Sequence, residues 1–184
     1  MSITLKDLPP ACGHNQGGIH YLRVIPVRNV VSIPEPVEHK IPLPLVLRDQ
    51  ALYADIWFTS GSFTEAMNED NNGEFFRPQI QIYVPKDSPD LAFAVAQLTG
   101  VRCVCLYVDG NNQAKLVGSL DAPLAFSSDL DTGNDYADKN GYKLKFSTET
   151  SHKAYFYLMY EGATPPLRKV FSNGFSFGFL RSQL

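Results

Sequence analysis

The chain has 184 residues, of which 44% are hydrophobic and 19% charged, and its net charge is −3. This is the size of a single domain with a real core, and a weakly acidic chain without a basic run argues against nucleic-acid binding, sequence-specific or not. No apolar run reaches the roughly 18 residues that span a bilayer, so we expect no membrane partner.

The cysteines and the N-terminal residues indicate the cellular compartment in which the protein is made. Three cysteines cannot form a disulfide framework, and Cys103 and Cys105 share one face of a predicted strand, where we expect small buried hydrophobes. Residues 1–8 lack the basic flank and apolar run of a secretory signal. We therefore expect synthesis in a reducing cytoplasm, wherever the protein finally acts.

The N-terminal part is predicted to be an arm followed by strands. Residues 1–16 form the arm, because Pro9 and Pro10 stop any short helix and the rest has no period. The core domain is predicted over residues 17–160. It opens with a strand at 19–25, whose antiparallel partner we expect at 29–33.

Residues 34–44 carry four prolines, which predicts a linker, an edge or a docking arm. A PxxP-type ligand for a signalling module is a less favoured alternative, because such matches are common.

Beyond the proline-rich segment we predict a hairpin of strands 52–58 and 62–67 around Ser60 and Gly61. The acidic, amide-rich residues 68–73 are predicted to be a loop tip.

Residues 74–120 carry the clearest signals, and the rest of the chain is organised around them. Alternation over 78–84 predicts a strand that buries Ile80, Ile82 and Val84. Ser88 and Pro89 predict the start of a helix over 89–99. Gly100 follows where a left-handed cap is wanted.

The predicted helix should pack one face on the sheet. The apolar run 101–108 predicts a central strand, which the turn at 109–112 connects to a strand within 114–120. The helix residues that we expect to contact the sheet are Leu91, Ala94, Val95 and Leu98.

The next segments are predicted to alternate between strand and loop. We expect a short strand at 122–126, then a long polar loop at 127–140 ordered by side-chain hydrogen bonds. A strand at 142–146 should turn Tyr142, Leu144 and Phe146 inward and both lysines outward. Residues 153–160, apolar on both faces, predict another central strand.

Together these elements predict an α+β, β-rich fold. We expect a β-sandwich or a partly closed β-barrel of about eight strands, with one main flanking helix and extended terminal arms. Thirteen glycines, thirteen prolines and 12% aromatic residues favour this class over a helical bundle.

Residues 161–184 are predicted to be a C-terminal extension with an aromatic row. A terminal row of phenylalanines needs a groove, because an exposed apolar strand is a liability in water. We expect the groove to belong at least partly to an adjacent subunit. The predicted subunit-interface residues are Phe171, Phe175, Phe177 and Phe179.

Two loops have spacings that resemble metal sites. Cys12 and His14, with His20, lack the second ligand pair that a structural zinc site needs. Residues 129–135 place Asp129, Asp131 and Asp135 at alternating positions, as a calcium loop does, but without its closing glutamate. We predict neither metal nor cofactor, and calcium stays the less favoured alternative to a hydrogen-bonded loop.

No catalytic arrangement is evident. Ser60 and Ser62 do not form a nucleophile elbow, and no histidine is tied to a serine by a recognisable pattern. The segment 109–112 is a hairpin turn rather than a phosphate loop, which would run into a helix N-terminus. We predict that the chain has no catalytic residues and is not an enzyme.

One block of sequence carries a resemblance. It comprises residues 114–126, 131–133, 139–146 and 154–157, and the opening 12–25 adds to it. This block resembles virion proteins of tailed phages that infect Bacteroidetes. The resemblance implies a structural tail, neck or tail-hub component, with tail tube-like proteins as the nearest general class, and a location in the virion.

Such proteins assemble as rings, so the resemblance implies a homo-oligomer that contacts other virion proteins. Extended arms and an aromatic terminal strand agree with subunits that exchange strands with neighbours. The alternative is a carbohydrate- or peptide-binding β-sandwich, because Trp57 and nine tyrosines could furnish a stacking surface. A small enzyme on a β-barrel comes third and would need a deep polar pocket.

Overall fold

The computed structural model describes residues 15–49, 52–70, 73–135 and 138–158. Over these residues the fold is α+β and rich in strands, which confirms the predicted class. The one helix of the described part is α1 (Pro89–Leu98), and a short 3-10 turn, η1 (Val27–Asn29), follows the first strand. The strands are β1 (Ile19–Pro26), β2 (Val30–Ser32), β3 (Lys40–Ile41), β4 (Val46–Leu47), β5 (Ala54–Asp55), β6 (Ser60–Asp70), β7 (Gly73–Pro85), β8 (Arg102–Asp109), β9 (Ala114–Val117), β10 (Leu124–Asp131), β11 (Gly141–Ser147) and β12 (Tyr155–Tyr157).

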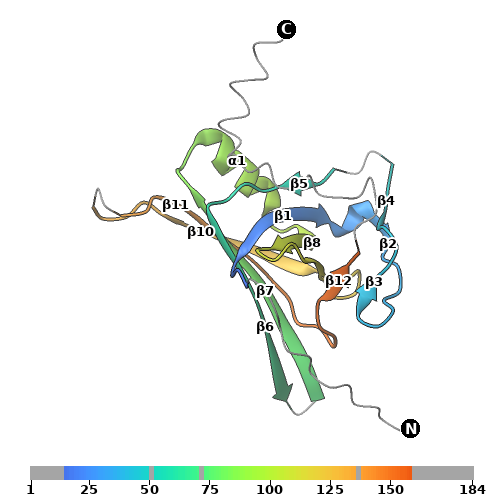
Figure 1. Cartoon of the computed structure of the whole chain (residues 1–184). Helices are drawn as coiled ribbons and strands as arrows, with labels where there is room; N and C mark the ends of the chain where they lie inside the picture. Colours follow the sequence, from blue (N-terminus) through green and yellow to red (C-terminus); the bar gives the residue numbers. More distant parts are fainter. Residues whose placement is uncertain (1–14, 50–51, 71–72, 136–137, 159–184) are drawn as a thin grey trace, which may run out of the picture.

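Most strands belong to one large, open, mixed sheet whose order is β3-β12-β9-β8-β10-β11-β7-β6 (Figure 1). One edge of β8 pairs with β1, and β1 pairs in turn with β5. The other edge of β8 pairs with β10 at residues 102–103 and with β9 at residues 105–108. The sheet therefore divides at β8 into two layers, a β10-β11-β7-β6 layer and a β5-β1-β8-β9-β12-β3 layer.

The main core lies between these layers. Phe146 of β11, Ile80 of β7, Leu22 and Val24 of β1 and Leu124 of β10 are completely buried in it. Burying one such side chain contributes about 1.5–3 kcal/mol. The predicted inward residues of the strands at 78–84 and 142–146 are all buried here, as expected. They are Ile80, Ile82, Val84, Tyr142, Leu144 and Phe146.

A second core covers the opposite face of β8. Val104 and Leu106 pack there with Ile41 and Tyr157, and partly buried residues of the segment 27–45 complete the cluster. Cys103 and Cys105 face the main core. The prediction that β8 is buried on both faces is therefore confirmed, and so is the burial of its two cysteines.

Helix α1 begins as its sequence predicts. The Ser88 hydroxyl accepts a hydrogen bond of 3.3 Å from the backbone N–H of Leu91, Pro89 occupies the first turn, and Gly100 has a φ of +75°. Val95 is buried and Leu91 packs against the main core, but Ala94 is exposed, contrary to expectation. Ala94 lies about 100° around the helix from Val95, so the contacting stripe is narrower than predicted.

The predicted partner of the first strand is wrong. Residues 30–32 do not pair with β1, because both edges of β1 are used by β8 and β5. After the turn η1, β2 pairs with β4 instead and forms a separate two-stranded sheet. The proline-rich residues 34–44 also do more than link, because Lys40–Ile41 forms β3, parallel to β12.

The predicted hairpin around Ser60 and Gly61 is also wrong. β5 pairs with β1, whereas β6 pairs along its whole length with β7, from Ser60 to Asp70. Gly61 lies within β6. Only glycine fits at this position, because a Cβ there would lie 2.7 Å from the Ile19 side chain. The glycine thus allows the two layers to approach closely and does not form a turn. The predicted loop tip 68–73 is shorter than expected, because residues 68–70 pair with residues 73–75 at the end of the β6–β7 hairpin.

The long loop predicted at 127–140 is shorter. β10 continues through Asp131 and pairs with β11 up to Gly141. Its side chains beyond Phe126 are exposed, which is why the sequence there resembles a loop. Within the described part of the strand predicted at 153–160, β12 comprises residues 155–157, and residues 159–160 lie outside the described residues. No helix of the described residues is long and apolar enough to cross a membrane.

Candidate functional site

The feature that most requires a partner is the hairpin of β6 and β7. Strand β7 pairs with β11 only from Gln79 to Pro85. Residues 73–78 pair with β6 alone, apart from a bridge between Phe76 and Thr150 and a backbone hydrogen bond of 3.4 Å that Thr148 donates to Pro78. Figure 1 shows the free half of the hairpin extending beyond the rest of the described chain.

Strand β6 ends the strand order, so one of its edges pairs with no strand of the described part. Its 11 residues present about 36 Å of backbone at that edge. Natural edges are usually protected by proline, by charged side chains, by a bulge or by a covering segment, and of these features β6 has the acidic side chains of Glu65, Glu69 and Asp70. β6 contains neither proline nor lysine and pairs with β7 without a bulge. It is therefore a template for strand addition.

The two faces of β6 differ. On the inner face Phe63 is half-buried, with its ring centroid 4.8 Å from that of Tyr107, and Met67 is 59% exposed. The outer face carries Ser60, Ser62 and Thr64. An added strand would thus meet an inner face that carries Phe63 and Met67 beside the carboxylates of Glu65 and Glu69, and a polar outer face.

A second open edge belongs to β10. It pairs with β8 only at Leu124 and Ala125, so residues 126–131 pair on one side alone, with β11. Figure 1 shows this β10–β11 arm projecting away from the two-layer body. The four-stranded layer therefore has an open edge on each side.

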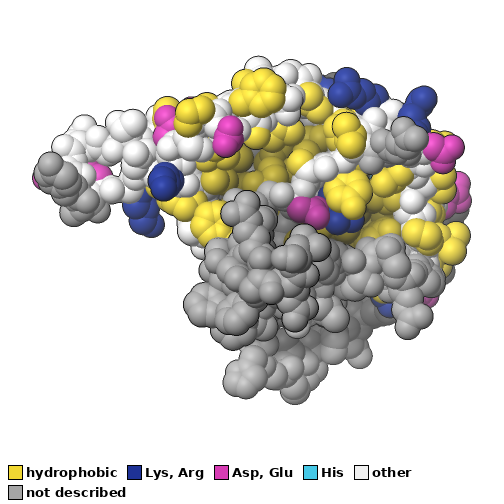
Figure 2. Space-filling view, turned by 90° about the horizontal axis from the view of Figure 1, so that it is seen from above, with side chains coloured by type: hydrophobic (Ala, Val, Ile, Leu, Met, Phe, Trp, Pro, Cys, Tyr) yellow, Lys and Arg dark blue, Asp and Glu magenta, His cyan; other side chains and the backbone are white. Residues whose placement is uncertain are grey.

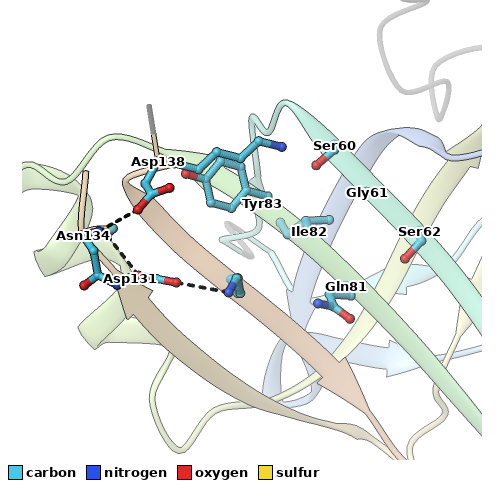
Figure 3. A pocket seen from close by; sticks show the side chains of 12 residues that line it. Ser60, Gly61, Ser62, Gln81, Ile82, Tyr83, Asp131, Asn134 and Asp138 are labelled. Atoms are coloured by element: carbon cyan, nitrogen blue, oxygen red, sulfur yellow. Dashed lines mark hydrogen bonds and ion pairs between the residues drawn. The ribbon is translucent and has the colours of Figure 1, made fainter. Parts of the chain in front are cut away.

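A polar groove of about 650 Å³ lies on the outer face of this layer (Figure 3). The loop after β10 forms one wall. There the Asp138 carboxylate accepts hydrogen bonds from the backbone N–H groups of Asn134 (2.8 Å) and Asp135 (3.0 Å). The Asp131 carboxylate accepts one from the N–H of Gly133 and pairs with Lys143 at 3.4 Å. The Gly133 N–H first, and then Lys143, lower the pKa of Asp131.

The floor of the groove carries Tyr83, which reaches across β11 because residue 141 is glycine. A Cβ at Gly141 would lie 2.8 Å from the Tyr83 hydroxyl oxygen. The Lys139 ammonium lies 5.8 Å from the Tyr83 ring centroid. Ser60, Ser62 and Gln81 also line the groove, and their side chains form no hydrogen bond with other described residues. Such a surface could hydrogen-bond a hydroxyl-rich ligand.

The aspartates of the calcium-like loop and of the turn at 109–112 accept hydrogen bonds that stabilise these loops. The Asp131 carboxylate is engaged by Gly133 and Lys143, and no group of three His, Cys, Asp or Glu residues in the described ranges could hold a metal. The Asp109 carboxylate accepts hydrogen bonds of 2.8 Å from the N–H groups of Asn111 and Gln113, which closes the hairpin turn. Cys12, His14 and the four C-terminal phenylalanines lie outside the described residues.

Apolar side chains are also exposed on α1 and in the segment before β6. Trp57 is 48% and Phe93 67% exposed. Figure 2 shows hydrophobic side chains gathered in a hollow of the surface seen from above. Trp57, named with the stacking alternative, is thus partly accessible, although Ile56 and Phe58 on either side pack against the main core.

Sequence reasoning missed the open β6 edge and the groove. A usable signal for the hairpin was the continuous strand-compatible sequence on both sides of residues 71–72. The groove depends on residues 60–62, 81–83 and 131–143, which only the pairing of four strands brings together. No protein-family model, curated protein or solved structure matches the chain.

Proposed function

We propose that this chain is a structural subunit of a tailed-phage virion, in a tail, neck or tail-hub ring, that assembles with copies of itself by strand addition. The observation that carries the assembly is the open edge of β6 on a projecting hairpin. The virion context rests on the sequence resemblance.

Strand addition satisfies the backbone groups that β6 leaves unpaired among the described residues. Main-chain hydrogen bonds then give affinity and alternate side chains give specificity. An interface of this kind joins two different surfaces, one strand and one edge, so repeated copies form a ring when the rotation closes. This agrees with the homo-oligomer expected from the resemblance.

The test is the mass of the full chain in solution, followed by negative-stain imaging. We expect a concentration-dependent oligomer above the monomer mass and closed rings in the images. A chain that stays monomeric from 1 to 200 µM would overturn the assembly function. Peptides of this chain in purified phage particles, identified by mass spectrometry, test the virion location.

A carbohydrate-binding module is the second candidate, because the groove at Tyr83 offers a ring and unused hydroxyl and amide groups. Its mixed charges, with Asp131 and Lys143 already paired, suit a neutral ligand rather than an anion. A monomer that binds neutral oligosaccharides, and loses binding in Tyr83→Ala, would favour this function over assembly.

A further inference from the structure

We infer that residues 167–184 of one copy add as an antiparallel strand to the open β6 edge of a second copy. The inference rests on the proposed assembly and identifies the segment that makes the contact. The segment lies outside the described residues, so its contribution is argued from its sequence and that of the edge from the structure.

The lengths and patterns of the two strands agree. β6 has 11 residues, and residues 170–180 form a stretch of the same length in which phenylalanines occupy alternate positions. On a strand the phenylalanines share one face, and serine and glycine lie on the other. β6 has a similar division: Phe63 and Met67 lie on the inner face together with Glu65 and Glu69, whereas Ser62 and Thr64 lie on the outer face.

The inner face of β6 also has room for aromatic side chains. Phe63 is only half-buried, and Met67 is 59% exposed. A neighbouring strand that turned its phenylalanines inward would cover both. Small outward residues would continue the polar outer face, where Ser60 and Ser62 line the groove in Figure 3.

The charges of the two strands are complementary. Residues 162–184 contain Arg168, Lys169 and Arg181 and no acidic residue. β6 contains three acidic residues, Glu65, Glu69 and Asp70, and no basic one. Attraction between unlike charges at an interface increases the rate of association and fixes the direction of docking.

These charges favour the antiparallel direction. In a register that places residue 180 opposite Ser60 and residue 170 opposite Asp70, Arg168 and Lys169 lie at the acidic end of the hairpin. The same register places Phe177 opposite Phe63 and Phe179 opposite Gly61. Odd-numbered residues then face odd-numbered residues, so the phenylalanines lie on the inner face, where Phe175 is opposite Glu65 and Phe171 is opposite Glu69. Directly opposed aromatic pairs stabilise sheets.

The direction of the chain favours a second copy as the acceptor. The chain passes β6 at Ala154, whose N–H donates to Glu65, and then runs alongside β3, where the N–H of Leu158 donates to the Ile41 carbonyl at 3.1 Å. β3 and β6 lie at opposite ends of the strand order. The last described residues, 155–158, therefore lie beside β9 and β3 rather than along the open edge of β6.

Two full-length variants test the inference by complementation. The donor variant carries Phe175→Ser, Phe177→Ser and Phe179→Ser, and the acceptor variant carries Glu69→Lys and Asp70→Lys. A control variant, Asp129→Lys, places a single charge reversal of the same kind on the open β10 edge. Oligomer mass is measured by light scattering, and circular dichroism checks that each variant folds.

We expect self-association at least tenfold weaker in the donor and acceptor variants and unchanged in the control. The two variants mixed in equal amounts should form a 1:1 heterodimer, since one supplies the intact segment and the other the intact edge. Raising the salt from 50 to 500 mM should weaken wild-type association.

Three results would overturn the inference. A folded donor variant that assembles like the wild type would exclude residues 167–184 as the added strand. If the acceptor variant still failed to assemble, another strand such as β10 would pair with the β6 edge. A mixture that forms no heterodimer excludes exchange between copies. An unfolded donor variant places the phenylalanines in their own core. A wild type that never self-associates refutes the proposed function itself.

Discussion

The carboxylate of Glu65 accepts a hydrogen bond of 2.7 Å from the backbone N–H of Ala154. Glu65 is in the middle of the open strand β6, and Ala154 is buried just before β12. One side chain therefore fixes the distance between the hairpin that we propose as the acceptor and the segment that leads out of the described chain.

Replacing Glu65 by Ala should destabilise the fold by about 1–3 kcal/mol, because the N–H of Ala154 would be left without its acceptor. Glu65→Gln keeps an acceptor oxygen and should lose less. Glu74→Ala removes an exposed carboxylate on the adjacent strand and should change the free energy of unfolding by no more than about 0.5 kcal/mol. Urea unfolding of the three variants provides the comparison. Equal losses of unfolding free energy in all three would show that the hydrogen bond between Glu65 and Ala154 does not stabilise the fold.

A cluster around Asp55 predicts a pH dependence. Asp55 accepts hydrogen bonds from Arg23 (2.7 and 2.9 Å) and from the Tyr21 hydroxyl (2.7 Å), which join β5 to β1. Burial raises the pKa of Asp55, but the bonds from Arg23 and Tyr21 outweigh it, so the pKa is lower than usual. Burial, followed by the bond to Asp55, raises the pKa of Tyr21.

Since the pKa of Asp55 is lowered by folding, its stabilisation is present above the unfolded-state value of about 4 and is lost as the pH falls through the folded value. The wild type should therefore lose more stability between pH 6 and pH 3 than Asp55→Asn does. The effect should be modest, because the Asp55 side chain is 40% exposed and screened by water. Urea midpoints at pH 6, 4 and 3 measure it. Asp121→Asn, at an exposed carboxylate without an ion pair among the described residues, should keep the wild-type slope.

Gly141 is predicted to tolerate no side chain. A Cβ there would meet the Val84 carbonyl oxygen, the Pro85 Cα at 2.8 Å and the Tyr83 hydroxyl oxygen at 2.8 Å. Two of these atoms belong to the backbone, so they cannot move aside cheaply. Gly141→Ala should cost about 1–3 kcal/mol or more in thermal or urea unfolding. Gly17→Ala, where nothing lies within 4 Å, is the matched control and should be nearly neutral.

The sequence was sufficient for elements with local signals. Ser88 and Pro89 specify where α1 begins, and alternation from Gln79 to Val84 specifies the buried face of β7, since both depend on neighbours in the chain. Alternation does not specify a partner, however. That is why β1 was assigned the wrong neighbour, and why Gly61, which serves a contact with Ile19, resembled a turn.

The candidate site is harder to predict from the sequence for the same reason. An open edge is defined by the strand that does not pair with it, and nothing within residues 60–70 indicates that. Polar strands present a second difficulty. Residues 127–131 expose their side chains and resemble a loop, although seven pairs join β10 to β11.

Ile41 provides the last test, because it comes from a segment whose composition predicts a linker. It is completely buried in the second core, against the face of β8 that carries Val104 and Leu106, and β3 holds it there through two parallel pairs with β12. Ile41→Ala removes three carbons from a closed site and should cost about 2–5 kcal/mol. Leu43→Ala, two residues further and 56% exposed, should change stability by no more than about 0.5 kcal/mol. If urea unfolding gave the two variants equal stability, the segment 34–44 would be the plain linker that its prolines suggest, and the second core would not contribute to the fold.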